Sequence, residues 1–581
     1  PPRPPITDLH THFAGCVGGG DLVRLGVEHG VVYPRRLLEE ARLQVDGDGD
    51  VPLPELSPPL QARLAERLAV PLDRRVTFLE MERVYRLRAP FTKARAMLVP
   101  LCRRIAADYA AAGVEYVELS VGSVVEADVL RAIHREVPAI ERESGVTIRF
   151  LAAISRHDDP EWDLDLVERI KALSGSVYVA GVDFMGHETN STSVFAPVLR
   201  AIADWAHRER PGFVVRVHAG ESPSHPENVR LALAATEGRE VKVRIGHGLY
   251  GVDAPTLDAV RRAGAIVEFN LDSNVALNHL HSARDVPLRR YVDAGVPIVL
   301  GSDGYGIYQT TPLAEARAAL LAGLEPSHLE GPLRAAEEAY LAFARQRDAG
   351  RAAGRAAYLV PDDAPPVHFT PAVVERRRSA LAERDATLAA RLSELGVPVI
   401  PPDGLGALLG AAGRAARPVL SIAGAWQRSW EAMPSASRGV AAAMLEELVA
   451  GLPPEVVLVT GGTRFGVEGL VGRAAVERGL TVVGALVRAT PPPSLDRGLV
   501  THACLVGETL YDKGAGLYEL VARHDGVALF VAGGQIVSDE IQTAKNLRLR
   551  YLLFDGAGGA SGQHAAELPE RAFTDAASAL H

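Results

Sequence analysis

The chain has 581 residues, which is more than one hydrophobic core normally serves, so we expect two or three domains. A hydrophobic fraction of 47% and a charged fraction of 23% are typical of a globular protein, and the net charge of -10 argues against a nucleic-acid partner. The sequence has no long apolar run that predicts a membrane span. Its three cysteines show no paired spacing, which favours a reducing cytoplasm.

Short apolar runs alternate with segments of helical periodicity over roughly the first 300 residues. This alternation predicts a parallel sheet, and eight repeats of it predict a closed (β/α)8 barrel. The expected strands are Ile6–Leu9, Tyr116–Leu119, Ile148–Ile154, Val177–Val182, Phe213–Val217, Val243–Ile245, Ile266–Phe269 and Ile298–Leu300.

Polar side chains follow most of these runs. They would gather at the carboxyl ends of the strands, where barrel enzymes carry their active sites. They are His10, His12, Arg156, Asp183, His218, Glu221, His247, Asn270 and Asp303.

A second α/β pattern begins near Pro418, and its alternating strands and helices predict a doubly wound, Rossmann-like fold. We therefore expect a barrel over residues 1–348, a helical connector over 349–416 and a second domain over 417–581. The strands expected in the second domain are Val419–Ala423, Val456–Val459, Thr481–Val487, Cys504–Val506, Gly526–Val531 and Tyr551–Phe554.

Four side chains in the barrel are candidate metal ligands: His10, His12, His218 and Asp303. His10 and His12 are two residues apart on one strand, so they face the same side. Three imidazoles and one carboxylate suit one zinc ion per chain and leave a position open for water. Each residue taken singly also fits a structural role, as a core histidine or a capping acid. His187, His279 and His281 are expected to be ordinary loop histidines.

Three residues near the expected metal could carry the chemistry. Bound zinc lowers the pKa of water to about 7. Glu221, three residues past His218, could shuttle a proton, and His247 could hold or deprotonate the water. Asp303 could both ligate the zinc and accept a hydrogen bond from the hydroxide.

Six segments, in this order, resemble the adenosine deaminase family of the amidohydrolase superfamily. They are Asp8–His12, Val177–Glu188, Val217–Glu221, Arg244–Gly248, Ser273–Asn274 and Ser302–Asp303. The resemblance covers residues 6–345 and implies zinc-dependent hydrolytic deamination of an aminopurine. It implies that Glu221 protonates the ring nitrogen and recognises the base, and that Gly186 lies against the base.

Two positions depart from that family. Where the family has an Asp at the ribose end, this chain has Ala14, and where it has a second Asp that recognises the purine imidazole ring, this chain has Gly304. The departures disfavour plain adenosine and permit a 5′-substituted or phosphorylated nucleoside. They also leave loss of activity open.

Two glycine-rich turns follow strands of the second domain, one within Val456–Gly472 and the other within Leu529–Glu540. These segments resemble the SLOG superfamily, which includes the LOG nucleotide phosphoribohydrolases. The backbone of such a turn can approach a phosphate, and the helix after the turn favours an anion. The resemblance implies a nucleotide or sugar-phosphate site, although a tight turn without a ligand is the alternative. Its expected residues are Gly461, Gly462, Thr463, Gly533, Gly534 and Glu540.

Two functions remain open from the sequence alone. The first is a purine deaminase with a ligand-binding appendage, which we expect to be a homo-oligomer acting on a small molecule. The second is a nucleotide-sensing effector or assembly protein whose barrel has diverged or lost activity. Ammonia release from a purine would distinguish the first from the second.

Overall fold

The computed structural model describes residues 4–122, 127–157, 160–173, 176–280, 282–353, 371–401, 408, 418–488, 490–507 and 510–580. It divides into two compact units, Pro1–His368 and Phe369–His581, and the division falls within the predicted connector. Each unit has its own large parallel sheet.

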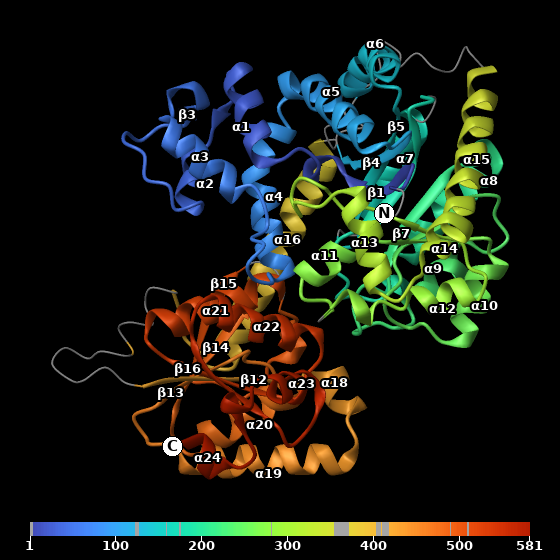
Figure 1. The fold of residues 1–581 in the computed structure, drawn as a ribbon. Helices are drawn as coiled ribbons and strands as arrows, with labels where there is room; N and C mark the ends of the chain where they lie inside the picture. Colours follow the sequence, from blue (N-terminus) through green and yellow to red (C-terminus); the bar gives the residue numbers. More distant parts are fainter. Residues whose placement is uncertain are drawn as a thin grey trace. The chain divides into compact units, whose positions relative to one another are not determined.

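The first unit is a nearly closed barrel of eight parallel strands, and each of the eight apolar runs predicted from the sequence overlaps one of them (Figure 1). The first and last strands meet where the N–H of Asp303 donates to the carbonyl oxygen of His10 at 2.8 Å. In spatial order the strands are β1 (Thr7–His12), β4 (Tyr116–Val121), β5 (Thr147–Ser155), β6 (Val179–Met185), β7 (Val214–Ala219), β8 (Lys242–His247), β9 (Ile266–Phe269) and β10 (Ile298–Leu300).

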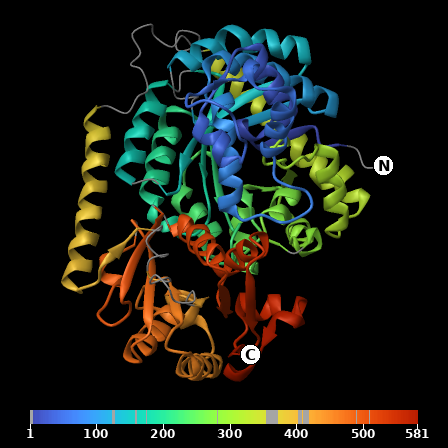
Figure 2. The same cartoon turned by 90° about the vertical axis from the view of Figure 1, so that its left-hand side faces the viewer.

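Helices surround the barrel strands, as Figure 2 shows from the side. Most are amphipathic, so one stripe packs on the strands while the other faces water. They include α1 (Gly19–Glu28), α2 (Arg35–Glu40), α3 (Pro58–Arg67), α4 (Phe78–Thr92), α5 (Arg95–Ala112), α6 (Ala127–Ser144), α7 (Pro160–Leu173), α8 (Ala196–Glu209), α9 (Asn228–Thr236), α10 (Ala254–Arg262), α11 (Leu271–Ala276), α12 (Leu288–Asp293), α13 (Pro312–Leu321), α14 (Pro326–His328) and α15 (Arg334–Ala353).

The long first connection of the barrel roofs its mouth. It contains α1–α4 and the short antiparallel pair β2 (Val32–Tyr33) and β3 (Val51–Pro52). Two backbone hydrogen bonds hold the segment before α4 across the barrel end. The N–H of Val70 donates to the carbonyl oxygen of Ile307, and the N–H of Val76 donates to that of Ala276. Phe78 then begins α4, and its ring joins a buried apolar cluster with Tyr308. The site beneath this roof is therefore enclosed.

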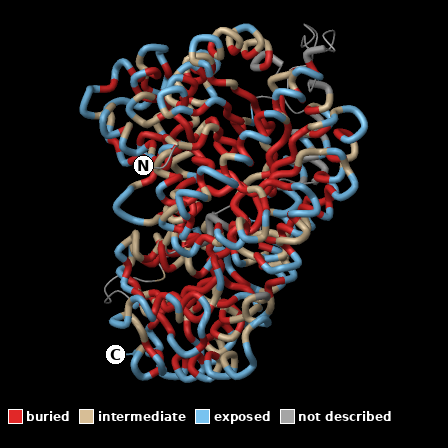
Figure 3. Tube along the Cα trace, turned by 45° about the vertical axis from the view of Figure 1, so that its right-hand side comes forward, coloured by how far each residue is buried: buried red, intermediate tan, exposed pale blue. Residues whose placement is uncertain are grey.

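The second unit is a doubly wound parallel sheet of eight strands. Alternate strand residues pack on opposite faces: Leu458 faces the layer that contains α19 and α20, while Val457 and Val459 face the layer that contains α21 and α22. Buried chain runs through the centre of each unit in Figure 3. The strand order is β11 (Val399–Ile400), β15 (His502–Gly507), β14 (Thr481–Val487), β13 (Val457–Thr460), β12 (Val419–Gly424), β16 (Val527–Val531), β17 (Arg550–Phe554) and β18 (Ala572–Phe573).

The helices of the second unit lie before, between and after these strands in the sequence. They are α16 (Pro371–Glu394), α18 (Gln427–Ala432), α19 (Ser435–Gly451), α20 (Gly466–Glu477), α21 (Leu510–Arg523), α22 (Gln535–Asn546), α23 (Gly559–Glu567) and α24 (Ala576–Leu580). No helix in the described part of the chain has the length and apolar content needed to cross a bilayer. The three cysteines, Cys16, Cys102 and Cys504, are free and buried.

Candidate metal centre and active site

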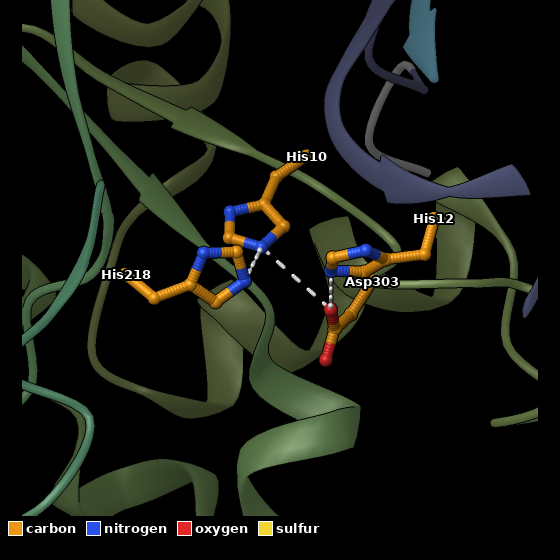
Figure 4. Close-up of side chains that lie close together, drawn as sticks. All are labelled: His10, His12, His218 and Asp303. Atoms are coloured by element: carbon orange, nitrogen blue, oxygen red, sulfur yellow. Dashed lines mark hydrogen bonds and ion pairs between the residues drawn. The ribbon is translucent and has the colours of Figure 1, made fainter. Parts of the chain in front are cut away.

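The four predicted ligands come together at the carboxyl end of the barrel. His10 and His12 lie at the end of β1, His218 lies near the end of β7, and Asp303 follows β10. Their candidate ligand atoms all lie within 4.8 Å of one another. Figure 4 shows the three rings and the carboxylate converging on one point. Among the described residues, this is the group of histidine and acidic side chains arranged to hold a metal ion.

The spacing of these atoms matches a small cation. Nε2 of His10 lies 3.1 Å from Nε2 of His218 (Figure 4). Oδ1 of Asp303 lies 3.6 Å from Nε2 of His10 and 3.2 Å from Nε2 of His12. Ligand atoms at about 2.1 Å from a tetrahedral zinc are themselves about 3.4 Å apart. These three separations are therefore close to those between the ligands of a small divalent cation.

Two carboxylates behind the rings fix which nitrogen faces the centre. Nδ1 of His10 lies 2.9 Å from Glu268, and Nδ1 of His218 lies 3.2 Å from Asp183. A carboxylate only accepts hydrogen bonds, so each Nδ1 carries the proton and each Nε2 presents a lone pair. Two lone pairs that face each other beside a carboxylate need a cation between them. The donor set therefore fits a metal ion.

Glu221 is held beside this centre by the loop that follows β7. The carboxylate of Glu188 accepts the N–H groups on both sides of it, from Gly220 at 2.8 Å and from Ser222 at 2.7 Å. Nε2 of His247, at the end of β8, lies 3.5 Å from Oε1 of Glu221. The two predicted proton-handling residues are therefore neighbours.

His247 and Asp303 have backbone conformations that non-glycine residues seldom adopt. Their φ angles are +71° and +57°. Such conformations cost about 1–3 kcal/mol each and persist where the surrounding structure enforces them, often at active sites. The side-chain amide of Asn274 donates to Nδ1 of His247 at 3.0 Å and fixes its ring. In this orientation Nε2 of His247 carries a proton toward Glu221.

Burial and neighbouring rings set the ionisation of the pair. Burial would raise the pKa of Glu221, but His247 and His279 lower it well below its ordinary range. Burial lowers the pKa of His247 to about 4, against an opposing effect of Glu221. Glu221 is therefore ionised and His247 neutral near pH 7.

His279 also reaches this site, where the sequence analysis expected an ordinary loop histidine. Its Nδ1 lies 3.2 Å from Oε1 of Glu221, and its side chain is fully buried. The ring of His187 stacks on that of His279 with a centroid separation of 6.4 Å, and on Phe78 at 4.4 Å. His281, the third histidine of that group, lies outside the described residues. The available sequence signal was Asn278, because asparagine favours a helix end and so fixes the backbone of the next residue.

The three other predicted substrate positions line the same end of the barrel. Gly186 follows β6 with a φ of +115°, and a Cβ there would lie 3.4 Å from Arg156. Gly304 has a φ of +133°, and a Cβ there would lie only 2.9 Å from the Cα of Gly15. The turn that contains Ala14 and Gly15 thus packs against the position where the family has an aspartate.

A buried arginine that the sequence analysis did not single out holds that turn. Arg88, on α4, is fully buried and donates at 2.6 Å to the carbonyl oxygens of Ala14, Val17 and Leu68. Its three bonds join the first loop of the barrel to the roof above it. The backbone at Ala14 is therefore fixed from behind rather than by its own side chain.

The two glycine-rich turns of the second unit follow β13 and β16, the two strands that flank β12. The first is already occupied: the carboxylate of Glu468 accepts the N–H of Thr463 at 3.3 Å and its hydroxyl at 2.6 Å. Gly462 packs tightly, because a Cβ there would lie 2.9 Å from Leu486. Glu468 thus fills the place where an anion would meet the first turn.

The second turn is more open. Gly533 has a φ of +93° and packs against Val537, whereas a Cβ at Gly534 would meet nothing within 4 Å. Glu540 lies on α22, the helix that follows this turn. Gly461 precedes Gly462 in the first turn, directly after β13.

Comparisons with known proteins show that the barrel is similar to deaminases. Residues 63–347 match the family model described as adenosine deaminase. A putative adenosine/adenine deaminase of Streptomyces coelicolor is 27% identical over 310 residues, which are 52% of this chain and 80% of that protein. An aminodeoxyfutalosine deaminase of Acidothermus cellulolyticus is 30% identical over 187 residues, which are 32% of this chain and about half (51%) of that protein.

Solved structures with similar folds include an Arabidopsis N6-mAMP deaminase, at 19% identity and a TM-score of 0.45. The alignment covers 60% of this chain and 98% of that one. An adenine deaminase from Arthrobacter aurescens aligns at 17% identity and a TM-score of 0.42, over 61% of this chain and 98% of that one. By the family match, residues 63–347 of this chain are similar to the adenosine deaminase family.

Proposed function

We propose that the barrel is a zinc-dependent hydrolytic deaminase of an aminopurine nucleoside or nucleotide, which releases ammonia. The observation that carries the proposal is the enclosed group of His10, His12, His218 and Asp303 with Glu221 beside it. The relatives from Streptomyces and Acidothermus, which are named as deaminases, support the reaction class.

Zinc held by the four ligands would act as a Lewis acid and make a water molecule acidic near neutral pH. The proposal assigns the remaining steps to side chains of the barrel. Glu221, which is ionised near pH 7, takes a proton from the attacking water and delivers it to the ring nitrogen next to the carbon that carries the amine. His247 donates from Nε2 and Asp303 accepts a hydrogen bond, so together they hold the attacking water. The second proton of the water passes to the amine, the bond from that carbon to the amine breaks, and ammonia leaves.

The proposed substrate is a nucleoside substituted or phosphorylated at the 5′ position rather than plain adenosine. Ala14 has no hydroxyl-binding side chain, and Gly304 has no carboxylate for the imidazole edge of a purine. Absent carboxylates also remove repulsion against an anionic substituent, which can cost several kcal/mol at close range. Gly186, Glu221 and Gly304 remain the proposed contacts to the base.

Ammonia release from a panel of purines tests this function. We expect the zinc-loaded protein to deaminate at least one member of a set containing adenine, adenosine and its 5′-phosphates. Glu221→Gln should abolish turnover and retain zinc, because a carboxylate that only moves protons does not bind the metal. Glu237→Gln is the matched control, since Glu237 is exposed and lies after α9.

The outcomes separate the alternatives. Loss of zinc together with activity in Glu221→Gln would make Glu221 a ligand or a structural residue. A kcat/KM for adenosine at least about tenfold above that for its 5′-phosphates, roughly 1.4 kcal/mol, would refute the substrate assignment. Tight nucleotide binding with no ammonia from any purine would instead favour a sensor whose barrel has lost activity.

We further propose that the second unit is a SLOG-like domain that binds a nucleotide or sugar phosphate. Its support is the position of the two turns beside the central strand β12, where the strand order reverses and doubly wound folds bind ligands. Because Glu468 occupies the first turn, the proposed phosphate contact is the open turn at Gly533 and Gly534. An N–H group at the start of α22 would then face the anion.

A further inference from the structure

We infer that His279 is a positioning residue for Glu221, and that it holds the carboxylate in the orientation that delivers a proton to the substrate. The inference rests on the proposed deaminase function and assigns to this site a residue outside the predicted ligand and catalytic set. Its basis is the local geometry of the loop after α11, the burial of the ring and its distance from Glu221.

The helix end before His279 fixes the position of its backbone. Asn278 adopts a left-handed conformation with a φ of +60°, and its N–H donates to Val275 at 3.2 Å. The N–H of His279 donates to the carbonyl oxygen of Asn274 at 3.0 Å. These two bonds form the Schellman motif that often ends helices. The hydroxyl of Tyr250 also donates to the carbonyl oxygen of His279 at 2.7 Å.

The same helix orients both rings that approach Glu221. Asn274 fixes the ring of His247 through its side chain and fixes the backbone of His279 through its carbonyl. Nδ1 of His279 then lies 3.2 Å and Nε2 of His247 lies 3.5 Å from Oε1 of Glu221. Both rings therefore approach the same oxygen of the carboxylate, Oε1.

Ring stacking restricts how His279 can turn. The planes of His187 and His279 differ by only 10°, and those of Phe78 and His187 by 7°. Phe78 begins α4, so the column of three rings runs from the roof of the site down to Glu221. A rotation of His279 away from Glu221 would break this stack.

Because His279 and Glu221 are both buried, the contact between them matters energetically to both side chains. The side chains of His279 and Glu221 are 0% and 3% exposed. A polar ring in such a place is costly unless it finds a partner, and a carboxylate there gains from each donor. A misplacement of about 1 Å in a catalytic group can reduce a rate about a hundredfold. The ring of His279 is thus placed to restrict the orientation of Glu221, on which the rate of proton transfer depends.

Two substitutions test the role. His279→Asn keeps an N–H donor close to the position of Nδ1, whereas His279→Leu fills the space without a donor. We expect His279→Leu to lower kcat about ten- to a hundredfold. Its KM should stay within about twofold of the wild-type value, and its zinc content should be unchanged. Asn should keep kcat within about threefold of the wild-type value. Asn278→Gly is the control, because glycine also adopts the left-handed turn and does not touch Glu221.

Crystal structures of the variants give a readout that does not depend on turnover. We expect Glu221 to keep its orientation in His279→Asn and to rotate in His279→Leu. An unchanged Glu221 in the Leu variant, or equal losses of kcat in both variants, would overturn the inference. If the wild-type protein releases no ammonia from any purine, the proposed function fails, and the orientation of Glu221 still decides whether His279 positions it.

Discussion

At the scale of single residues, the barrel interior is held by buried charges as well as by apolar packing. Glu118, on β4, is fully buried and lies 2.7 Å from Arg244 and 3.3 Å from Arg347. The hydroxyls of Tyr116 and Tyr340 donate to it at 2.5 Å and 2.7 Å. Removing one member of such a group leaves the others buried without their partner, which typically costs about 3–5 kcal/mol.

This group predicts a pH-dependent stability. Burial would raise the pKa of Glu118, but Arg244, Arg347 and the two tyrosine hydroxyls lower it from 4.5 to about 2. The folded state therefore binds this proton less tightly than the unfolded state. The stabilisation, about 3 kcal/mol, is complete above about pH 4.5 and is lost as the pH falls toward 2.

Urea unfolding at a series of pH values measures this effect. Glu118→Gln should unfold more easily than the wild type at pH 7, and its free energy of unfolding should fall less between pH 5 and pH 3. Glu237→Gln, at an exposed position, should keep the wild-type pH dependence. A Glu118→Gln variant with the wild-type slope would show that Glu118 does not titrate as described.

From the sequence alone, we could identify those candidate site residues whose side chains have a recognisable chemical function. His10, His12, His218 and Asp303 were found because each follows an apolar run and each can bind a metal. Arg88 and His279 were not found. In the sequence, a buried arginine cannot be distinguished from the many surface arginines, and a histidine after a short helix cannot be distinguished from a loop residue. Their roles depend on contacts with distant segments, which local patterns do not contain.

At the scale of elements, turns at the carboxyl ends of the strands shape the site. The loop after β10 passes so close to the turn after β1 that only glycine fits at two facing positions. The Cα atoms of Gly304 and Gly15 leave no room for a Cβ between them, and Gly304 also has a φ of +133°. The missing aspartate at Gly304 therefore follows from the path of the backbone.

This packing predicts the effect of restoring the family's residue. Gly304→Asp should lower the free energy of unfolding by at least about 1–3 kcal/mol, from backbone strain alone, and should not increase activity on adenosine. Gly20→Asp is the control, since Gly20 is in the first turn of α1 with open space around it. Thermal unfolding and ammonia assays would check both. A stable Gly304→Asp variant with improved adenosine turnover would contradict this account.

The central strands were largely predictable from the sequence, and the short strands at the edges of the second sheet were not. Each of the eight barrel strands overlaps a run predicted from the sequence, because buried parallel strands form continuous apolar segments. In the second unit, β11 and β18 have only two residues each, Val399–Ile400 and Ala572–Phe573, which is too short for any pattern. Pairing with an existing sheet, rather than their own sequence, makes them strands.

At the scale of the whole molecule, the proposed metal ligands all belong to the first of the two units. A ligand that binds only the folded state stabilises it, by about 2.7 kcal/mol at a concentration 100 times its dissociation constant. We therefore expect zinc removal by a chelator to lower the unfolding temperature of the first unit and to leave that of the second unchanged.

Differential scanning calorimetry with and without added zinc measures this difference. Re-addition of zinc should restore the first transition, and His12→Ala should show no response. A zinc-dependent shift in the second transition, or an equal response of His12→Ala, would place the metal elsewhere.

The ligand set also spans the barrel's closure. His10 lies on the first strand and Asp303 follows the last one, 293 positions later, and a backbone bond between these two residues joins the strands. During synthesis, a nascent chain would hold two histidines from the start but would lack the fourth ligand until the eighth strand had left the ribosome. Metal capture would then be a late event that reports a completed barrel, and a chain stalled before Asp303 would hold the metal only weakly.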